Sequence, residues 1–114
     1  DITARVRTLS GRFAAHLARL AEHPLVGETR HCGLMGAIEM APERSPKGFA
    51  APGKVGAYMA QQLIDRGVIG RAIVDSIAFS PPMIMTEDEM DEMFAAVGPA
   101  LDATQDWARR EGHL

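Results

Sequence analysis

Arg71 is the residue of this 114-residue sequence whose type and position could do chemistry. It follows a short apolar run that begins at Val68, so a β-strand is predicted to end at this arginine and to expose its side chain. A guanidinium group is planar and permanently charged, and it donates two parallel hydrogen bonds to a carboxylate, which an ammonium group does not. From the residues alone, the simplest interpretation is a surface arginine paired with Asp75, and carboxylate binding is the alternative.

Other reactive side chains do not form a known catalytic pattern. The sequence has no Ser/His/Asp grouping, phosphate-binding glycine loop or paired-carboxylate motif, so no catalytic residue is assigned. His31 and Cys32 are adjacent and His23 precedes them, but a single cysteine lacks the second ligand pair that is typical of zinc sites. We therefore expect no metal site, and a partly buried thiol at Cys32.

Length and composition limit the classes of protein that fit. A chain of 114 residues with 46% hydrophobic and 24% charged side chains predicts one globular domain over residues 1–114. A net charge of -3 gives no electrostatic reason to expect nucleic acid or an anionic membrane as a partner, and no apolar run reaches the roughly 18 residues of a membrane helix. A single cysteine favours the reducing cytoplasm. Because Asp1 already lies in a helical pattern, we expect a fragment of a longer protein.

Apolar spacing of three to four residues predicts three helices, over residues 3–22, over residues 54–66, and from Thr86 onward. Thr86 and Glu89 form a capping-box pattern at the start of the last helix. Pro99 lies inside that helix, and we expect a kink or a break near residues 95–98 because proline removes a backbone donor.

The remaining apolar runs predict a sheet. They cover residues 26–31, 34–40, 68–71 and 77–80. Residues 41–53 are rich in proline and glycine and are predicted to form a surface loop. The expected fold is therefore α+β, with an antiparallel sheet of three or four strands and helices on one face. A parallel sheet, or residues 77–80 outside the sheet, would contradict this prediction.

Three segments resemble one protein family. They are GLMGAIEM, DRGVIGR and IAFSPPMIMTEDEMDEMF, in this order along the chain. Together they are similar to the C-terminal small domain of class III aminotransferases, which are pyridoxal-phosphate enzymes of fold type I and include the omega-transaminases. The resemblance extends from about Arg5 to Asp102 and is most specific over residues 67–94. The sequence departs from the family pattern at His31, Cys32 and Pro99.

The resemblance implies an enzyme that transfers an amino group from an amine or amino acid to a keto acid. It implies a homodimer, with pyridoxal 5'-phosphate bound by a large domain that precedes these residues. Neither Lys47 nor Lys54, the two lysines of the sequence, matches the family's cofactor-binding lysine, so we expect this chain alone to be inactive. No cofactor-binding residue is assigned. Arg71 matches the arginine with which omega-transaminases bind a substrate carboxylate, and which swings aside for amine substrates.

Two other functions fit the same residues. The chain could be a free-standing α+β interaction or regulatory module without a cofactor, which a start codon just before Asp1 would favour. Alternatively, the cofactor is kept and the reaction differs, since fold type I also includes mutases and decarboxylases. The reading frame upstream of Asp1 separates the first alternative from an aminotransferase, and substrate profiling of the full-length protein separates the second.

Overall fold

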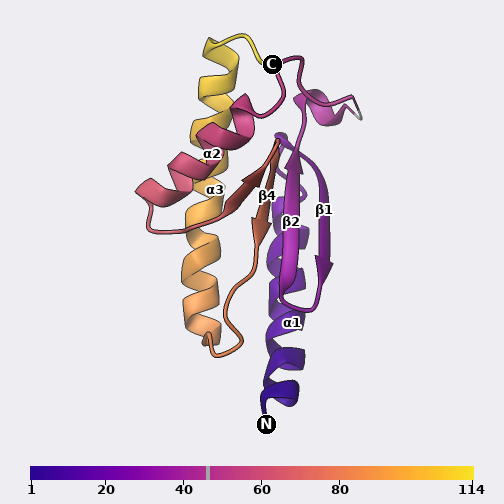
Figure 1. Cartoon of the computed structure of the whole chain (residues 1–114), viewed down its shortest axis with the longest axis vertical. Coiled ribbons are helices and arrows are strands. Elements are labelled where there is room, and N and C mark those ends of the chain that lie inside the picture. Colours follow the sequence, from indigo (N-terminus) through magenta and orange to yellow (C-terminus); the bar gives the residue numbers. More distant parts are fainter. Residues whose placement is uncertain (46) are drawn as a thin grey trace.

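The computed structural model describes residues 1–45 and 47–114 and has an elongated shape, with extents of 49 × 27 × 20 Å and the termini at opposite ends (Figure 1). Its elements in chain order are α1 (Ile2–Leu20), β1 (Val26–Cys32), β2 (Met35–Met40), the short 3₁₀ helix η1 (Pro42–Arg44), α2 (Lys54–Asp65), β3 (Arg71–Ile73), β4 (Ser76–Phe79) and α3 (Glu87–Arg110). The three predicted helices are confirmed. Between β2 and α2 the chain forms a loop that contains η1, as predicted, and Pro46 of that loop lies outside the described residues.

The four strands form one antiparallel sheet in the order β1-β2-β4-β3. Strands β1 and β2 form a hairpin whose turn begins at Gly33, with a φ of 59° that glycine adopts without a steric cost. Strands β3 and β4 form a second hairpin through the two residues Val74 and Asp75. Because β4 pairs with β2, residues 77–79 lie in the middle of the sheet. The predicted antiparallel α+β architecture is therefore confirmed.

The prediction of a strand over residues 68–71 is wrong, because β3 begins at Arg71 instead of ending there. The reason is the C-terminus of α2, which ends in a Schellman motif: Gly67 N–H donates to Ile64 O and Val68 N–H donates to Leu63 O, both over 2.9 Å. Val68 is buried against the helix and its N–H is already used, so it cannot join the sheet. Arg71 consequently opens the strand.

The helices cover one face of the sheet, as predicted. The side chains on that face are buried, and include Ile38 of β2 with Ile77 and Phe79 of β4. Phe79 contacts Phe94 of α3, with ring centroids 5.7 Å apart, and α1 lies so close to β2 that a Cβ on Gly36 would be 2.6 Å from the Phe13 ring. The opposite face of the sheet carries no helix in the described structure.

Helix α3 runs through Pro99 without a break, so of the predicted kink or break near residues 95–98 the break is wrong and the kink stays a prediction. The start of the helix is as predicted, since Thr86 and Glu89 form both hydrogen bonds of a capping box, each 3.1 Å long. Pro99 is exposed, and the buried side chains of Val97 and Leu101 on either side of it keep both halves of the helix against the core. Tertiary packing outweighs the local cost of the proline.

Candidate functional site

Arg71 lies on the open face of the sheet, at the edge formed by β3. The strand register places it opposite Ala78, Ala78 opposite Ala37, and Ala37 opposite Arg30. Directly paired residues of neighbouring strands point to the same face, so these four side chains form one row across the sheet. Two arginines therefore stand at the two ends of the row, with only alanine methyl groups between them.

The two arginines differ in their partners. Arg30 donates to the carboxylates of Glu28 and Glu39, both at 3.3 Å. Arg71 is exposed and has no side-chain hydrogen bond or ion pair with any of the residues that the structure describes. One end of the row thus carries a neutralised guanidinium, and the other end carries a free one.

The predicted pair between Arg71 and Asp75 does not form. Asp75 is 8% exposed, and its carboxylate accepts two backbone hydrogen bonds, from Gly56 N–H at 2.9 Å and from Gly53 N–H at 3.0 Å. Both N–H groups belong to the first turn of α2, including its N-cap position. Asp75 therefore neutralises the positive end of a helix, and the positive charge of Arg71 is not compensated by it.

The backbone that carries Arg71 is fixed on its N-terminal side by close packing. A Cβ added to Gly70 would lie 2.7 Å from Ile77 Cγ2 and 3.1 Å from Leu63 Cδ1, so the main chain at this point contacts both the sheet and α2 directly. On its other side, Arg71 enters the ladder with β4. A long side chain without partners among the described residues thus projects from a fixed main-chain position.

The residues considered for a metal site are not brought together. His23 contacts Asp102 of α3 through Nε2 at 2.8 Å, whereas His31 and Cys32 lie at the end of β1. In the part of the chain that the structure describes, no group of three or more His, Cys, Asp or Glu residues is placed to hold a metal ion. The prediction of a partly buried thiol is wrong, because Cys32 is exposed at the end of an edge strand.

The described residues do not fit a pyridoxal-phosphate site. A phosphate group is typically held at a free helix N-terminus, but the first turns of all three helices are already occupied, α1 by the Asp1 carboxylate, α2 by the Asp75 carboxylate and α3 by the Thr86 hydroxyl. Lys47 and Lys54 are both exposed. Neither lysine is enclosed in the way that a covalently held cofactor requires.

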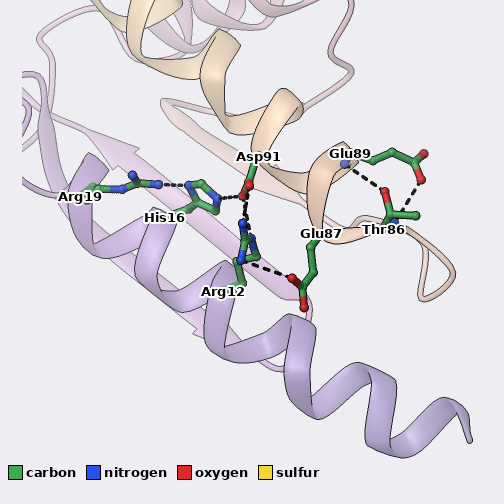
Figure 2. A network of polar contacts seen from close by, with 7 residues as sticks. All are labelled: Arg12, His16, Arg19, Thr86, Glu87, Glu89 and Asp91. Carbon is green, nitrogen blue, oxygen red and sulfur yellow. Dashed lines mark hydrogen bonds and ion pairs between the residues drawn. The ribbon is translucent and has the colours of Figure 1, made fainter.

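Sequence reasoning did not predict a polar cluster that lies between α1 and α3. It consists of Arg12, His16, Arg19, Glu87 and Asp91, and is called the Asp91 cluster below (Figure 2). Arg12 donates to both oxygens of Asp91, with Nε 2.8 Å from Oδ1, and also approaches Glu87 at 3.4 Å. His16 Nε2 lies 2.7 Å from Asp91 Oδ1, and its Nδ1 contacts Arg19.

The charges of the Asp91 cluster satisfy one another. The hydrogen bond to Arg12, and then that to His16, lower the pKa of Asp91, while Asp91 raises the pKa of Arg12. The cluster connects the first helix to the last, and both oxygens of the Asp91 carboxylate already accept hydrogen bonds. We therefore interpret it as a contact that joins the two helices and not as a substrate site. The spacing of Arg12, His16 and Arg19 along one helix face was the available signal.

Comparison with known proteins shows what the chain is similar to. No family model matches it. The chain is 39% identical over 116 residues to an uncharacterized aminotransferase of Sinorhizobium fredii, which covers 98% of this chain and 25% of that protein. It is 38% identical over 107 residues to the mitochondrial gamma-aminobutyrate transaminase 1 of Oryza sativa subsp. indica, over 93% of this chain and 21% of that protein. The chain is therefore similar, over almost its whole length, to one domain of aminotransferases.

Solved transaminase structures show the same similarity. An omega transaminase mutant from Pseudomonas jessenii superimposes with a TM-score of 0.87 and 36% identity, over 93% of this chain and 24% of that one. The omega-transferase from Vibrio fluvialis JS17 gives a TM-score of 0.87 and 34% identity, over 95% and 26%. The resemblance to an aminotransferase C-terminal small domain is therefore confirmed, and the chain spans about a quarter of the length of these relatives.

The aminotransferase domain contains, within its described residues, no helix with the length and apolarity needed to span a membrane. The rice relative is mitochondrial by its name. The cytoplasmic location of this chain stays a prediction.

Proposed function

We propose that residues 1–114 are the C-terminal small domain of a class III aminotransferase that transfers an amino group from an amine or amino acid to a keto acid. The aminotransferase relatives, and a chain about a quarter of their length, support this proposal. Pyridoxal 5'-phosphate, bound by the rest of the enzyme, supplies the group that carries the amino group between substrates. The family resemblance also supports a homodimer, which sedimentation of the full-length protein would test.

In this enzyme, Arg71 binds the carboxylate of the substrate. The observation that carries this proposal is its guanidinium, which has no counter-ion among the described residues. Arg30 in the same row is neutralised by two glutamates, and the carboxylate of the predicted partner Asp75 is used by α2. An exposed guanidinium without a counter-ion among the described residues is available to an anionic ligand such as a carboxylate.

The arrangement also suits substrates without a carboxylate. The main chain of Arg71 is fixed through Gly70 and β4, whereas its side chain has no hydrogen bond or ion pair with the described residues that must be broken before it moves. The guanidinium can thus form two parallel hydrogen bonds with an amino acid or keto acid, and turn toward solvent when an amine occupies the site. We propose that this movement gives the enzyme its dual substrate recognition.

Replacing Arg71 with alanine in the full-length enzyme tests the role. The half-reaction with an amino acid should slow by about a hundredfold, because a charge-assisted bidentate contact is lost, while the half-reaction with a simple amine should change little. Arg71→Lys should recover only part of the loss, since an ammonium group lacks the planar pair of donors. Stopped-flow spectroscopy measures the rates of the amino acid and amine half-reactions in both variants.

Arg30→Ala is the matched control, because it removes the other arginine of the same row. It should leave both half-reactions unchanged. Equal losses for the amine and the amino acid in Arg71→Ala would remove Arg71 from the substrate site.

A further inference from the structure

We propose that Asp75 is a positioning residue for Arg71: its carboxylate fixes the β3–β4 hairpin to α2 and thereby sets where the substrate-binding guanidinium stands. This inference rests on the proposed role of Arg71. It assigns to Asp75 no contact with substrate or cofactor.

The first step is that α2 depends on Asp75 for its N-terminal cap. The N-cap residue is Gly53, which has no side chain to accept a hydrogen bond, and the first turn contains no acidic residue. Asp75, which is distant in sequence, supplies both the hydrogen-bond acceptor and the negative charge that the first turn lacks. The two oxygens of its carboxylate accept from Gly53 N–H and Gly56 N–H. The hairpin turn and the helix are therefore joined by two charge-assisted hydrogen bonds.

The second step is that the turn lies directly on the helix. A Cβ added to Gly56 would come within 1.9 Å of the carbonyl oxygen of Val74, which leaves no space between the two backbones. Val74 itself has a φ of 55°, a conformation that a β-branched residue rarely adopts. Such a conformation persists only where surrounding contacts hold it, and the hydrogen bonds of the adjacent Asp75 are those contacts.

The third step connects the turn to Arg71. Strand β3 has only the three residues Arg71–Ile73, and it is an edge strand that pairs with β4 alone. Its far end is the turn that Asp75 holds, and the Asp75 carbonyl oxygen also accepts from Met40 N–H of β2 at 2.9 Å. A shift of the turn would move the whole short strand, and Arg71 with it.

The same contacts explain why Arg71 is free. A carboxylate four residues away from an arginine is a natural counter-ion, but both oxygens of Asp75 point into the first turn of α2. Asp75 thus holds the hairpin in place and at the same time leaves the guanidinium available for an anionic ligand.

A double-mutant cycle in the full-length enzyme tests the inference. Asp75→Asn keeps the size of the side chain but replaces one acceptor with a donor that faces a backbone N–H, so the hairpin should lose its fixed position. We expect the KM for an amino acid to rise on the order of tenfold with the amine half-reaction unchanged. In the Arg71→Ala background the same substitution should cause no further loss for the amino acid.

Two further variants keep the test decisive if Asp75→Asn does not fold. Gly56→Ala pushes the turn away from α2 while the carboxylate stays intact, and it should cause the same selective loss. Glu89→Gln weakens the N-terminal cap of α3, far from the hairpin, and should affect both substrates equally.

The outcomes separate the two proposals. If Arg71→Ala is selective for the amino acid but Asp75→Asn and Gly56→Ala lower both half-reactions equally, or add their loss to that of Arg71→Ala, the positioning role of Asp75 is overturned and the role of Arg71 stands. If Arg71→Ala is itself unselective, the proposed function fails first.

Discussion

Asp91 shows how a single charged residue can make the stability of this domain depend on pH. The hydrogen bonds from Arg12 and His16 lower its pKa in the folded state, whereas an unfolded aspartate has a pKa of about 3.9. Below about pH 4 the unfolded chain therefore takes up a proton that the folded chain does not, and stability falls as the pH falls. Urea unfolding midpoints between pH 6 and pH 3 should decrease, and less steeply in Asp91→Asn.

The control for this prediction is Asp106→Asn, which makes the same change of charge at an exposed position of α3. It should keep the pH dependence of the unmodified chain. If the urea midpoint of Asp91→Asn depends on pH as steeply as that of the unmodified chain, the Asp91 cluster does not link the helices in solution.

Gly36 is a second residue with a measurable effect, because it lets α1 approach the sheet. An added Cβ would lie 2.6 Å from Phe13 Cε1 and 2.8 Å from Leu17 Cδ1, two buried side chains with little room to move. Gly36→Ala should lower the free energy of unfolding by about 1–3 kcal/mol through overpacking. Gly11→Ala, where nothing lies within 4 Å of the added Cβ, should instead raise it by up to about 1 kcal/mol. Urea titrations compare the two, and a loss in both variants would contradict the steric explanation.

At the scale of elements, the sequence predicted what depends on local patterns. The apolar spacing located all three helices, and the capping box at Thr86 and Glu89 has the predicted hydrogen bonds. The predictions failed where a backbone or side-chain group has more than one possible partner. Val68 has the composition of a strand residue, but its N–H completes the cap of α2, and Asp75 has the spacing of an ion-pair partner, but its carboxylate caps the start of α2. A one-dimensional pattern cannot show which of two donors or acceptors is nearer in the fold.

Helix α3 is the element in which local cost and tertiary packing differ most. Pro99 removes one intrahelical hydrogen bond, and its exposed ring contributes nothing to the core. Pro99→Ala should therefore raise the free energy of unfolding, by about 1–3 kcal/mol, without changing the fold. Thermal unfolding followed by circular dichroism measures the shift. Gly98→Ala, in the same helix and with open space around the added Cβ, should give a smaller gain of up to about 1 kcal/mol. A lower melting temperature in Pro99→Ala would show that the ring has a packing role.

At the scale of the whole molecule, the domain has an open sheet face that displays one uncompensated arginine, and a covered face that holds the core. The N-termini of α1, α2 and α3 each have a side-chain cap from within the chain, so these three helix ends are less available to a phosphate. This division is what the proposed function requires: the domain contributes a residue to a substrate site, and the cofactor is bound elsewhere in the enzyme.

The chain alone should therefore form no specific covalent adduct with pyridoxal phosphate. Lys47 and Lys54 are exposed, and each can react only as any surface lysine does. Equimolar cofactor, borohydride and an excess of free lysine as a competitor should leave the chain unmodified by mass spectrometry, because no enclosed site raises the local concentration of the cofactor. The full-length enzyme, treated in the same way, should retain one cofactor per chain on a lysine outside these 114 residues. A stable adduct on Lys47 or Lys54 despite the competitor would mean that this domain itself holds the cofactor.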